Sequence, residues 1–110
     1  METKETITIA KDFSNRLGAR YRKDGPYSGQ QFLEDFLLPA FERAVVGGHC
    51  LLVDLDGAWG YPSSFVSGSF GKLSLEKGPA LVEKHLRFKS DENNMRLERV
   101  RKEIANPKVK

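Results

Sequence analysis

Two adjacent hydroxyl side chains, Ser63 and Ser64, have the types and spacing best suited to chemistry in this sequence. They follow Pro62 and precede an apolar helical pattern, where a helix N-cap is expected. The first turn of a helix presents unpaired N–H groups and the positive end of the helix dipole. Hydroxyl groups held there can cap the helix, or can bind or carry an anion. We therefore expect the function to lie near the turn that contains them.

A strand, a glycine-bearing turn and a helix position these serines. The apolar run Cys50–Leu55 predicts a buried strand that ends at Asp56–Gly57. The turn is marked by Gly57, Gly60 and Pro62. The helix that follows has its apolar positions at Phe65, Val66, Phe70 and Leu73.

The flanking segments alternate between strand and helix patterns. Before the central strand we predict strands at Glu5–Ala10, with Ile7 and Ile9 on one face, and at Leu17–Tyr21. An amphipathic helix at Gly29–Val46 begins with a Ser28/Gln31 capping box, is kinked or split by Pro39, and ends at Gly47–Gly48. After the central helix we predict a helix at Ala80–Lys84, a strand at Leu86–Phe88, and a helix at Asp91–Ala105 that Ser90 caps and that buries Met95, Leu97, Val100 and Ile104.

This order of elements predicts an α/β fold. We expect a mixed or mainly parallel four-stranded sheet packed with about four helices. In such sheets the functional edge is the carboxyl end of the strands, which is where residues 54–64 fall.

Composition and length limit the class of protein. The 110 residues predict one domain over residues 1–105 and a basic tail over residues 106–110. The formal charge of +3 does not demand a nucleic-acid partner. A single cysteine excludes an intramolecular disulfide. The N-terminus lacks a signal-peptide pattern, and no apolar run approaches the ~20 residues of a membrane span. We expect a cytoplasmic protein without membrane contact.

The run VDLDGAWGYPSSFVSGSFGKL (residues 53–73) resembles the central motif of a bacterial and phage family, the STAS-like domains of unknown function. The segment RYRKDGPYSGQQFLEDFLLPAF and the strand Leu86–Phe88 support the resemblance. It implies a STAS-like fold and a non-enzymatic regulatory module without a cofactor, similar to anti-sigma-factor antagonists. In those relatives a partner kinase phosphorylates a serine or threonine at the matching helix start. Here Ser63 matches, with Ser64 beside it, although Pro62 replaces the usual acidic residue. The implied partner is a protein, for example a kinase-like ATPase or a transcription regulator.

The residues after the strand also suggest a surface for a partner or for a second copy. Ser64, Gly68 and Gly71 share one helix face, and two glycines cost a helix about 1 kcal/mol each, which close approach of another backbone would offset. Trp59 and Tyr61 are either a lid on the core or an anchor for a partner. The residues proposed to bind a partner are Trp59, Gly60, Tyr61, Pro62, Phe65, Gly68 and Gly71; packing within the domain is the alternative.

An enzyme is the rival hypothesis. The run LLVDLDGAW (residues 51–59) resembles the first motif of haloacid-dehalogenase-like phosphatases. The resemblance implies Asp54 as nucleophile and Asp56 as acid/base near magnesium. Ala58 departs from the threonine or valine usual in that family. The alternative is that both carboxylates end the strand and accept hydrogen bonds from loop amides.

Other chemistry does not fit the spacing. Gly71–Lys72 lacks the remaining P-loop residues. His49 and Cys50 point to opposite sides of a strand and His85 stands alone, so neither a metal site nor a nucleophile pair is indicated. The basic residues of the last helix alternate with Glu98 and Glu103, which favours a solvated face over a nucleic-acid surface; they are Arg96, Arg99, Arg101 and Lys102.

Overall fold

The computed structural model describes residues 1–107. Its strands are β1 (Thr3–Thr8), β2 (Cys50–Asp54) and β3 (Leu86–Lys89). Its α-helices are α1 (Gly29–Phe32), α2 (Leu38–Gly47), α3 (Ser63–Val66), α4 (Lys72–Lys77), α5 (Pro79–His85) and α6 (Asn94–Ala105). Shorter helical turns lie at Ile9–Phe13 (η1), Arg22–Asp24 (η2), Leu33–Leu37 (η3) and Ser67–Gly71 (η4). The predicted tail at residues 106–110 lies in part outside the described residues, since positions 108–110 are not among them.

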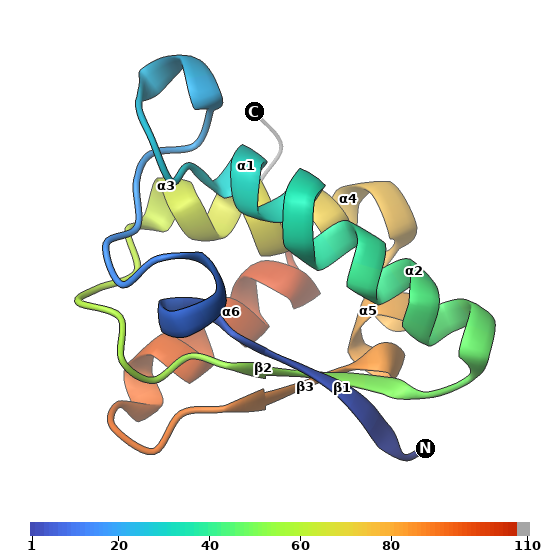
Figure 1. The fold of residues 1–110 in the computed structure, drawn as a ribbon. Coiled ribbons are helices and arrows are strands. Elements are labelled where there is room, and N and C mark those ends of the chain that lie inside the picture. Colours follow the sequence, from blue (N-terminus) through green and yellow to red (C-terminus); the bar gives the residue numbers. More distant parts are fainter. Residues whose placement is uncertain (108–110) are drawn as a thin grey trace.

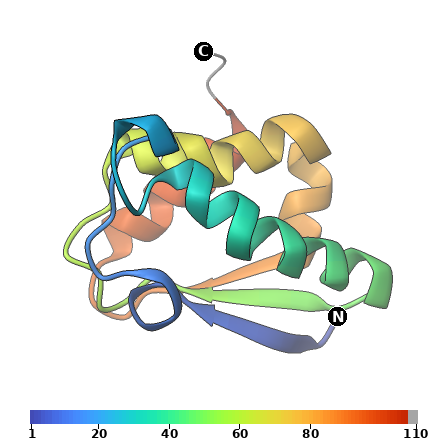
Figure 2. The ribbon, with the colours of Figure 1, turned by 45° about the horizontal axis from the view of Figure 1, so that its top comes forward.

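The three strands form one parallel sheet in the order β1-β2-β3. Ile7 of β1 pairs with Val53 of β2, which pairs with Phe88 of β3, so these side chains share the face that packs on the core. Figures 1 and 2 show the helices stacked over one face of this sheet, with the strands forming the other layer. The α/β class and the parallel pairing are confirmed.

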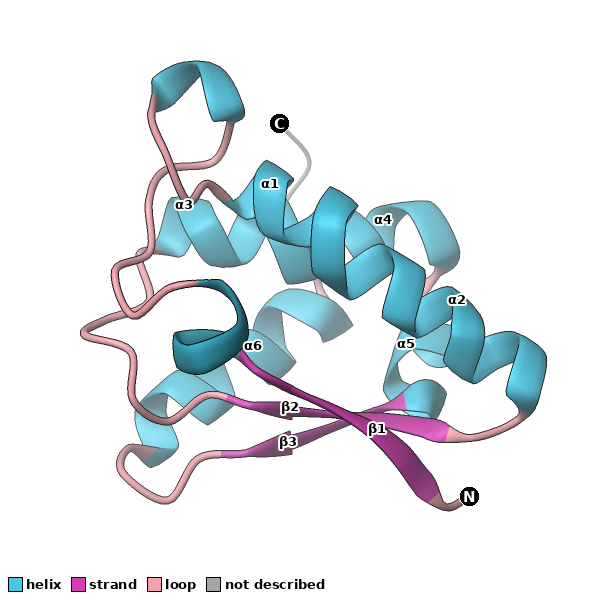
Figure 3. Ribbon diagram, viewed as in Figure 1, coloured by secondary structure: helices cyan, strands magenta, loops and turns pink. Residues whose placement is uncertain are grey.

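The prediction of a fourth strand at Leu17–Tyr21 is wrong. Figure 3 shows this segment as loop. Its backbone groups pair with the chain around the start of α1 instead of with a strand: Gly18 N–H donates to Tyr27 O at 2.8 Å, and Ala19 O accepts from Gly29 N–H at 2.8 Å. The segment is held at the N-terminus of a helix, where the first N–H groups need acceptors.

The long amphipathic helix is present from Gly29 to Gly47 as α1, η3 and α2. Ser28 caps it, accepting a hydrogen bond from Gln31 N–H at 3.0 Å, and Gly48 ends it with φ +67°. The sequence predicted that Pro39 would kink or split this helix. The chain stays helical on both sides of Pro39, and what changes there is the hydrogen-bonding pattern. The turn before Pro39 is widened, and Leu38 N–H donates to Leu33 O, five residues earlier.

The central helical stretch, residues 63–77, comprises α3, η4 and α4 and contains a continuous run of buried residues. All residues from Phe65 to Gly71 are buried. Phe32 and Phe65 lie 5.8 Å apart between ring centroids, and Phe70 packs edge-on against Phe88 of β3. Aromatic packing of this kind fixes the central stretch between the first long helix and the sheet.

Two element boundaries differ from the prediction. β1 ends at Thr8, and Ile9 begins a helical turn, although Ile7 and Ile9 are both buried as expected. The last helix begins at Asn94 and is capped by Asn93, whose side-chain oxygen accepts from Met95 N–H at 2.8 Å, not by Ser90. Met95 therefore sits in the first turn and is 72% exposed, so its predicted burial is wrong.

Candidate functional site

The chain turns between β2 and α3 through residues 55–64, here called the corner. β2 ends at Asp54, and Gly57 adopts φ +92°, a backbone conformation that favours glycine. Gly57 N–H donates to the Glu92 carboxylate at 2.7 Å, which ties the corner to the loop before α6. The corner thus leaves the carboxyl end of the central strand, as predicted.

Tyr61 holds the corner from the inside. Its ring is buried, and its hydroxyl donates to Leu55 O at 2.8 Å. Burial raises the pKa of Tyr61, so the phenol stays protonated and remains a donor over the physiological range. Tyr61 was predicted as a partner-binding residue; its burial corrects this, since the side chain already packs in the core.

Two arginines of α6 fasten the corner from the other side. The Arg96 guanidinium donates to Leu55 O at 3.3 Å and to Ala58 O at 3.2 Å, and lies 5.0 Å from the centroid of the Tyr61 ring. Arg99 donates to Tyr61 O at 2.8 Å. The prediction of a solvated helix face is therefore wrong for Arg96, which is half-buried, and holds for Arg99, Arg101 and Lys102, which are exposed, although Arg99 also donates to the corner. Arg96 and Arg99 are three residues apart and therefore lie on one helix face. This spacing was the signal in the sequence that could have predicted their common role.

Trp59 is the large side chain that the corner presents to solvent. The side chain is 67% exposed, while the backbone N–H of Trp59 donates to Asn15 O at 2.9 Å. The Arg16 guanidinium carbon lies 4.3 Å from the centroid of its ring, close enough for a cation–π contact. A shallow recess of about 400 Å³ runs between these side chains and Leu17, Gly60, Tyr61 and Pro62.

The two serines do not cap the helix, which corrects the prediction that opened the sequence analysis. Pro62 is the N-cap residue, and neither serine side chain makes a capping hydrogen bond. Pro62 O accepts from Val66 N–H at 3.1 Å, so the helix starts one residue earlier than a serine cap would allow. Ser63 is exposed and Ser64 is half-buried, both in the first helical turn.

The small-residue face of the central helix is covered by the domain itself. A Cβ atom on Gly68 would lie 2.9 Å from the Arg20 carbonyl oxygen, and one on Gly71 would lie 2.6 Å from the Glu103 carboxylate. Phe65 is fully buried. The predicted roles of Phe65, Gly68 and Gly71 in binding a partner are therefore wrong, and the alternative of tight internal packing holds.

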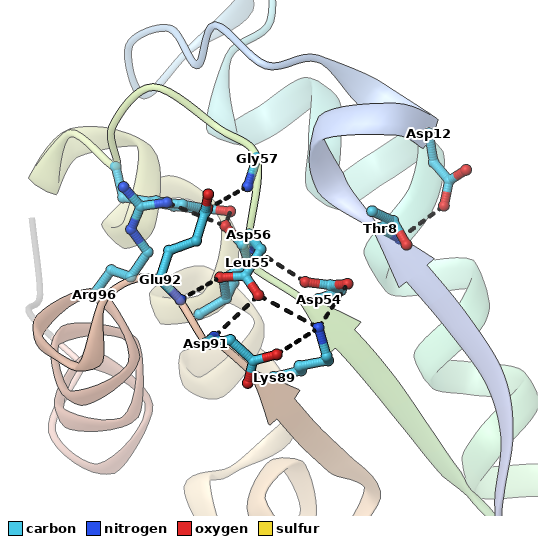
Figure 4. Close-up of polar contacts among 11 residues, drawn as sticks. Thr8, Asp12, Asp54, Leu55, Asp56, Gly57, Lys89, Asp91, Glu92 and Arg96 are labelled. Carbon is cyan, nitrogen blue, oxygen red and sulfur yellow. Dashed lines mark hydrogen bonds and ion pairs between the residues drawn. The ribbon is translucent and has the colours of Figure 1, made fainter.

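Asp54 and Asp56 organise the neighbouring loop (Figure 4). Asp56 accepts from Asp91 N–H at 3.0 Å and from Glu92 N–H at 3.1 Å, while Asp54 accepts from Asp56 N–H at 2.9 Å. Lys89 Nζ lies 3.4 Å from the Asp56 carboxylate and 3.8 Å from that of Asp54.

This pairing explains the charge state of Asp56. The hydrogen bond from Asp91 N–H is the main cause that lowers the pKa of the Asp56 carboxyl, with Glu92 N–H and Lys89 adding to it. Across residues 1–107 no group of three or more histidine, cysteine or acidic side chains is arranged to hold a metal ion. The arrangement matches the alternative in which both carboxylates end the strand and accept from loop amides.

The cysteine and the histidines, which the sequence did not place in a metal site or a nucleophile pair, make contacts between elements of the fold. Cys50 is buried, with its sulfur 3.6 Å from Lys84 O. His85 is buried, and its Nδ1 lies 2.8 Å from His49 O. These contacts join β2 to the end of α5.

Comparison with known proteins identifies the family. A family model described as a STAS-like domain of unknown function matches residues 28–96, which span α1 to the first turn of α6 and contain the whole corner. No curated protein and no solved structure matched the chain. No helix within residues 1–107 is long and apolar enough to cross a membrane. The chain belongs to the family of STAS-like domains of unknown function.

Proposed function

We propose that this STAS-like domain is a non-enzymatic regulatory module that docks a partner protein through the exposed side of the corner. The docking surface comprises Trp59 with Arg16 against its ring, Gly60, Pro62 and Ser63. The observation that carries the proposal is that Trp59 is 67% exposed on a turn that the rest of the domain holds in place. Tryptophan and arginine are the side chains most enriched among binding hot spots.

The hydrogen bonds of the corner support this proposal. Asn15 O holds the Trp59 backbone, Arg99 holds the Tyr61 carbonyl, and Arg96 holds those of Leu55 and Ala58. A side chain on such a turn loses little backbone freedom when it binds, which favours affinity. The surface is smaller than the set of residues from Trp59 to Gly71 that the sequence predicted, because the residues from 65 to 71 are buried.

Regulation by phosphate on Ser63 belongs to the same proposal. Ser63 is exposed in the first helical turn, two residues after the carbonyl that Arg99 binds. A phosphate would add a charge of about −1.5 to −2 at the edge of the docking surface. The family resemblance suggests a kinase-like ATPase or a transcription regulator as partner.

Affinity capture with matched variants tests the proposal. The wild-type chain, Trp59→Ala and Val46→Ala are used as baits in extracts of the native host. Val46 is a suitable control because it is 89% exposed in the last turn of α2, at the opposite end of the molecule from the corner (Figure 1).

We expect one partner that the wild-type and Val46→Ala chains capture and that Trp59→Ala binds at least about tenfold more weakly. The captured partner is then titrated against the three purified chains. Equal binding by Trp59→Ala and Val46→Ala would contradict the proposal. Mass spectrometry of the wild-type chain from the same cells tests the proposed regulation by phosphate on Ser63. The absence of phosphate on Ser63 both in growth and in starvation would count against this regulation.

A further inference from the structure

The sheet has a free edge at β1. This strand pairs with β2 alone, and within residues 1–107 no strand lies on its other side. Figures 1 and 2 show β1 as an outermost strand of the sheet. Its pairing is regular from Glu5 to Thr8, which lie opposite residues 51–54 of β2. An edge strand presents backbone N–H and C=O groups that a further strand can bond.

The backbone of Thr6 points away from β2. Thr8 N–H donates to the Asp12 carboxylate at 2.8 Å instead of to β2, so the backbone groups of Thr8 face the free edge. Successive residues of a parallel strand direct their backbone groups to opposite sides, which places the N–H and C=O of Thr6 on the same free side. Thr6 is also exposed. These two groups are therefore accessible to an added strand, whereas Asp12 closes the edge at Thr8.

The opposite edge of the sheet, at β3, is less open. β3 has four residues, and the Arg87 side chain donates to Leu86 O at 2.9 Å. A charged side chain on an edge strand opposes the addition of another strand. β1 has six residues, and within residues 1–107 the side chain that bonds to its backbone is that of Asp12, at Thr8. Of the two edges, β1 is the one that can accept a strand.

A groove of about 310 Å³ lies beside this edge, between β1 and the helix from Gly29 to Gly47. Thr6 lines it together with apolar side chains, which are Ile7, Phe36, Pro39 and Ala40. Phe36 and Pro39 are half-buried, so an occupant of the groove would bury further apolar surface. Because side chains of a strand alternate between its two faces, every second side chain of an added strand can enter the groove.

The charge of the groove selects its occupant. The lining contains three carboxylates and one guanidinium, those of Glu5, Asp12, Asp35 and Arg43, so its formal charge is −2. Arg22, outside the lining, pairs with Asp35 at 3.0 Å but also with Glu34 at 3.1 Å, so it brings no net positive charge. Lys4 and Lys11 are exposed and do not line the groove. Charge complementarity therefore favours an added strand that carries lysine or arginine.

We propose that the free edge of β1 binds an extended basic segment of a partner protein, which adds a fourth strand to the sheet. The segment bonds the N–H and C=O of Thr6, and an apolar side chain lies on Phe36 and Pro39. A lysine or arginine of the segment lies beside the carboxylates of the groove. In strand addition, main-chain hydrogen bonds give affinity and alternate side chains give specificity. This surface shares no residue with the corner and does not rest on the proposed docking function.

Peptide selection tests the pattern and the charge of the occupant. Short random peptides displayed on phage are selected on the purified full chain, with counter-selection on Thr6→Pro. We expect enriched peptides in which apolar residues alternate with lysine or arginine and which lack proline at the centre. The most enriched peptide is then synthesised and titrated against purified variants.

Variants of the edge and of the groove separate the two parts of the proposal. Thr6→Pro removes an N–H at an exposed edge position where proline is tolerated, and should raise the dissociation constant of the peptide at least about tenfold. Thr6→Val keeps this N–H and should bind as wild type does. Circular dichroism of both variants checks that the fold is retained.

Asp12→Asn removes one negative charge from the groove but keeps an oxygen that can accept from Thr8 N–H. It should weaken binding about threefold, as expected for an exposed ion pair. Asp24→Asn is the matched control, because Asp24 lies outside the groove lining, and it should leave peptide binding unchanged.

Hydrogen exchange at the Thr6 amide gives a readout that needs no variant, since saturating peptide should slow it. Unchanged exchange at this amide, wild-type affinity in Thr6→Pro, or selection that yields acidic peptides or none would each overturn the proposal. Dimerisation of the chain alone that Thr6→Pro abolishes would assign the edge to a second copy, and would overturn it as well.

Discussion

Replacing Arg96 with methionine tests how the corner is held. The side chain donates to Leu55 O at 3.3 Å and Ala58 O at 3.2 Å. Methionine keeps an aliphatic side chain at this position of α6 but removes both donors. Leu55 O still accepts a hydrogen bond from the Tyr61 hydroxyl at 2.8 Å. Most of the cost in stability therefore comes from the Ala58 carbonyl, which loses its Arg96 donor.

The expected cost is about 2 kcal/mol. A hydrogen bond to a charged group contributes about 1.5–3 kcal/mol, and the lower half of that range suits long bonds from a half-buried side chain. The unfolding entropy of about 2.1 cal/mol/K per residue gives about 0.23 kcal/mol/K for this chain, so the loss should lower the Tm by about 9 °C.

Urea and thermal denaturation of wild type, Arg96→Met and Arg101→Met measure this effect. Arg101 is exposed on the same helix and has no hydrogen bond to the corner among residues 1–107, so its replacement should change stability by less than about 0.5 kcal/mol. Adding Tyr61→Phe to Arg96→Met should cost more than the sum of the single changes, because Leu55 O then loses both donors. Equal stability of Arg96→Met and Arg101→Met would refute this description of the corner.

Two further predictions concern the central helix and the loop before α6. Gly68→Ala should destabilise the domain by about 1–3 kcal/mol in urea denaturation, because the new Cβ would lie 2.9 Å from Arg20 O. In the control variant Gly60→Ala the new Cβ meets no atom within 4 Å, so this change should be tolerated. A Gly68→Ala variant more stable than wild type would contradict the packing described here. The lowered pKa of Asp56 means that its carboxylate stabilises the fold above its unfolded pKa of about 4 and loses this effect as pH falls through the lower folded value. The free energy of unfolding should therefore fall between neutral and acidic pH more steeply in wild type than in Asp56→Asn, and identical pH profiles would disprove this role.

The sequence predicted those features that depend on local patterns. The apolar run of β2, the glycine at the end of α2 and the amphipathic helix after Ser28 each carry a period or a cap that sequence reading can detect. The family resemblance, based on the motif around residues 53–73, is confirmed by the family match.

Features that depend on distant segments were not predictable from local patterns. The segment at Leu17–Tyr21 was predicted as a strand, but its backbone acceptors serve the N–H groups at the start of α1. The face at Gly68 is occupied by Arg20, 48 positions earlier, as the contact between them shows. Likewise, Arg96 shows its role only once α6 is folded against the corner. The contacts of Arg20 with Gly68 and of Arg96 with the corner are long-range, and a single sequence carries no spacing rule for them.

The central claim, that the exposed corner docks a partner, is tested most directly by site-specific photo-crosslinking. A benzophenone amino acid is placed at Trp59 in one chain and at Val46 in another, and both are expressed in the native host and irradiated. We predict a discrete crosslinked protein from position 59 that is missing from position 46. Adducts that are identical at the two positions, or no adduct at position 59 while the domain remains folded, would contradict the claim.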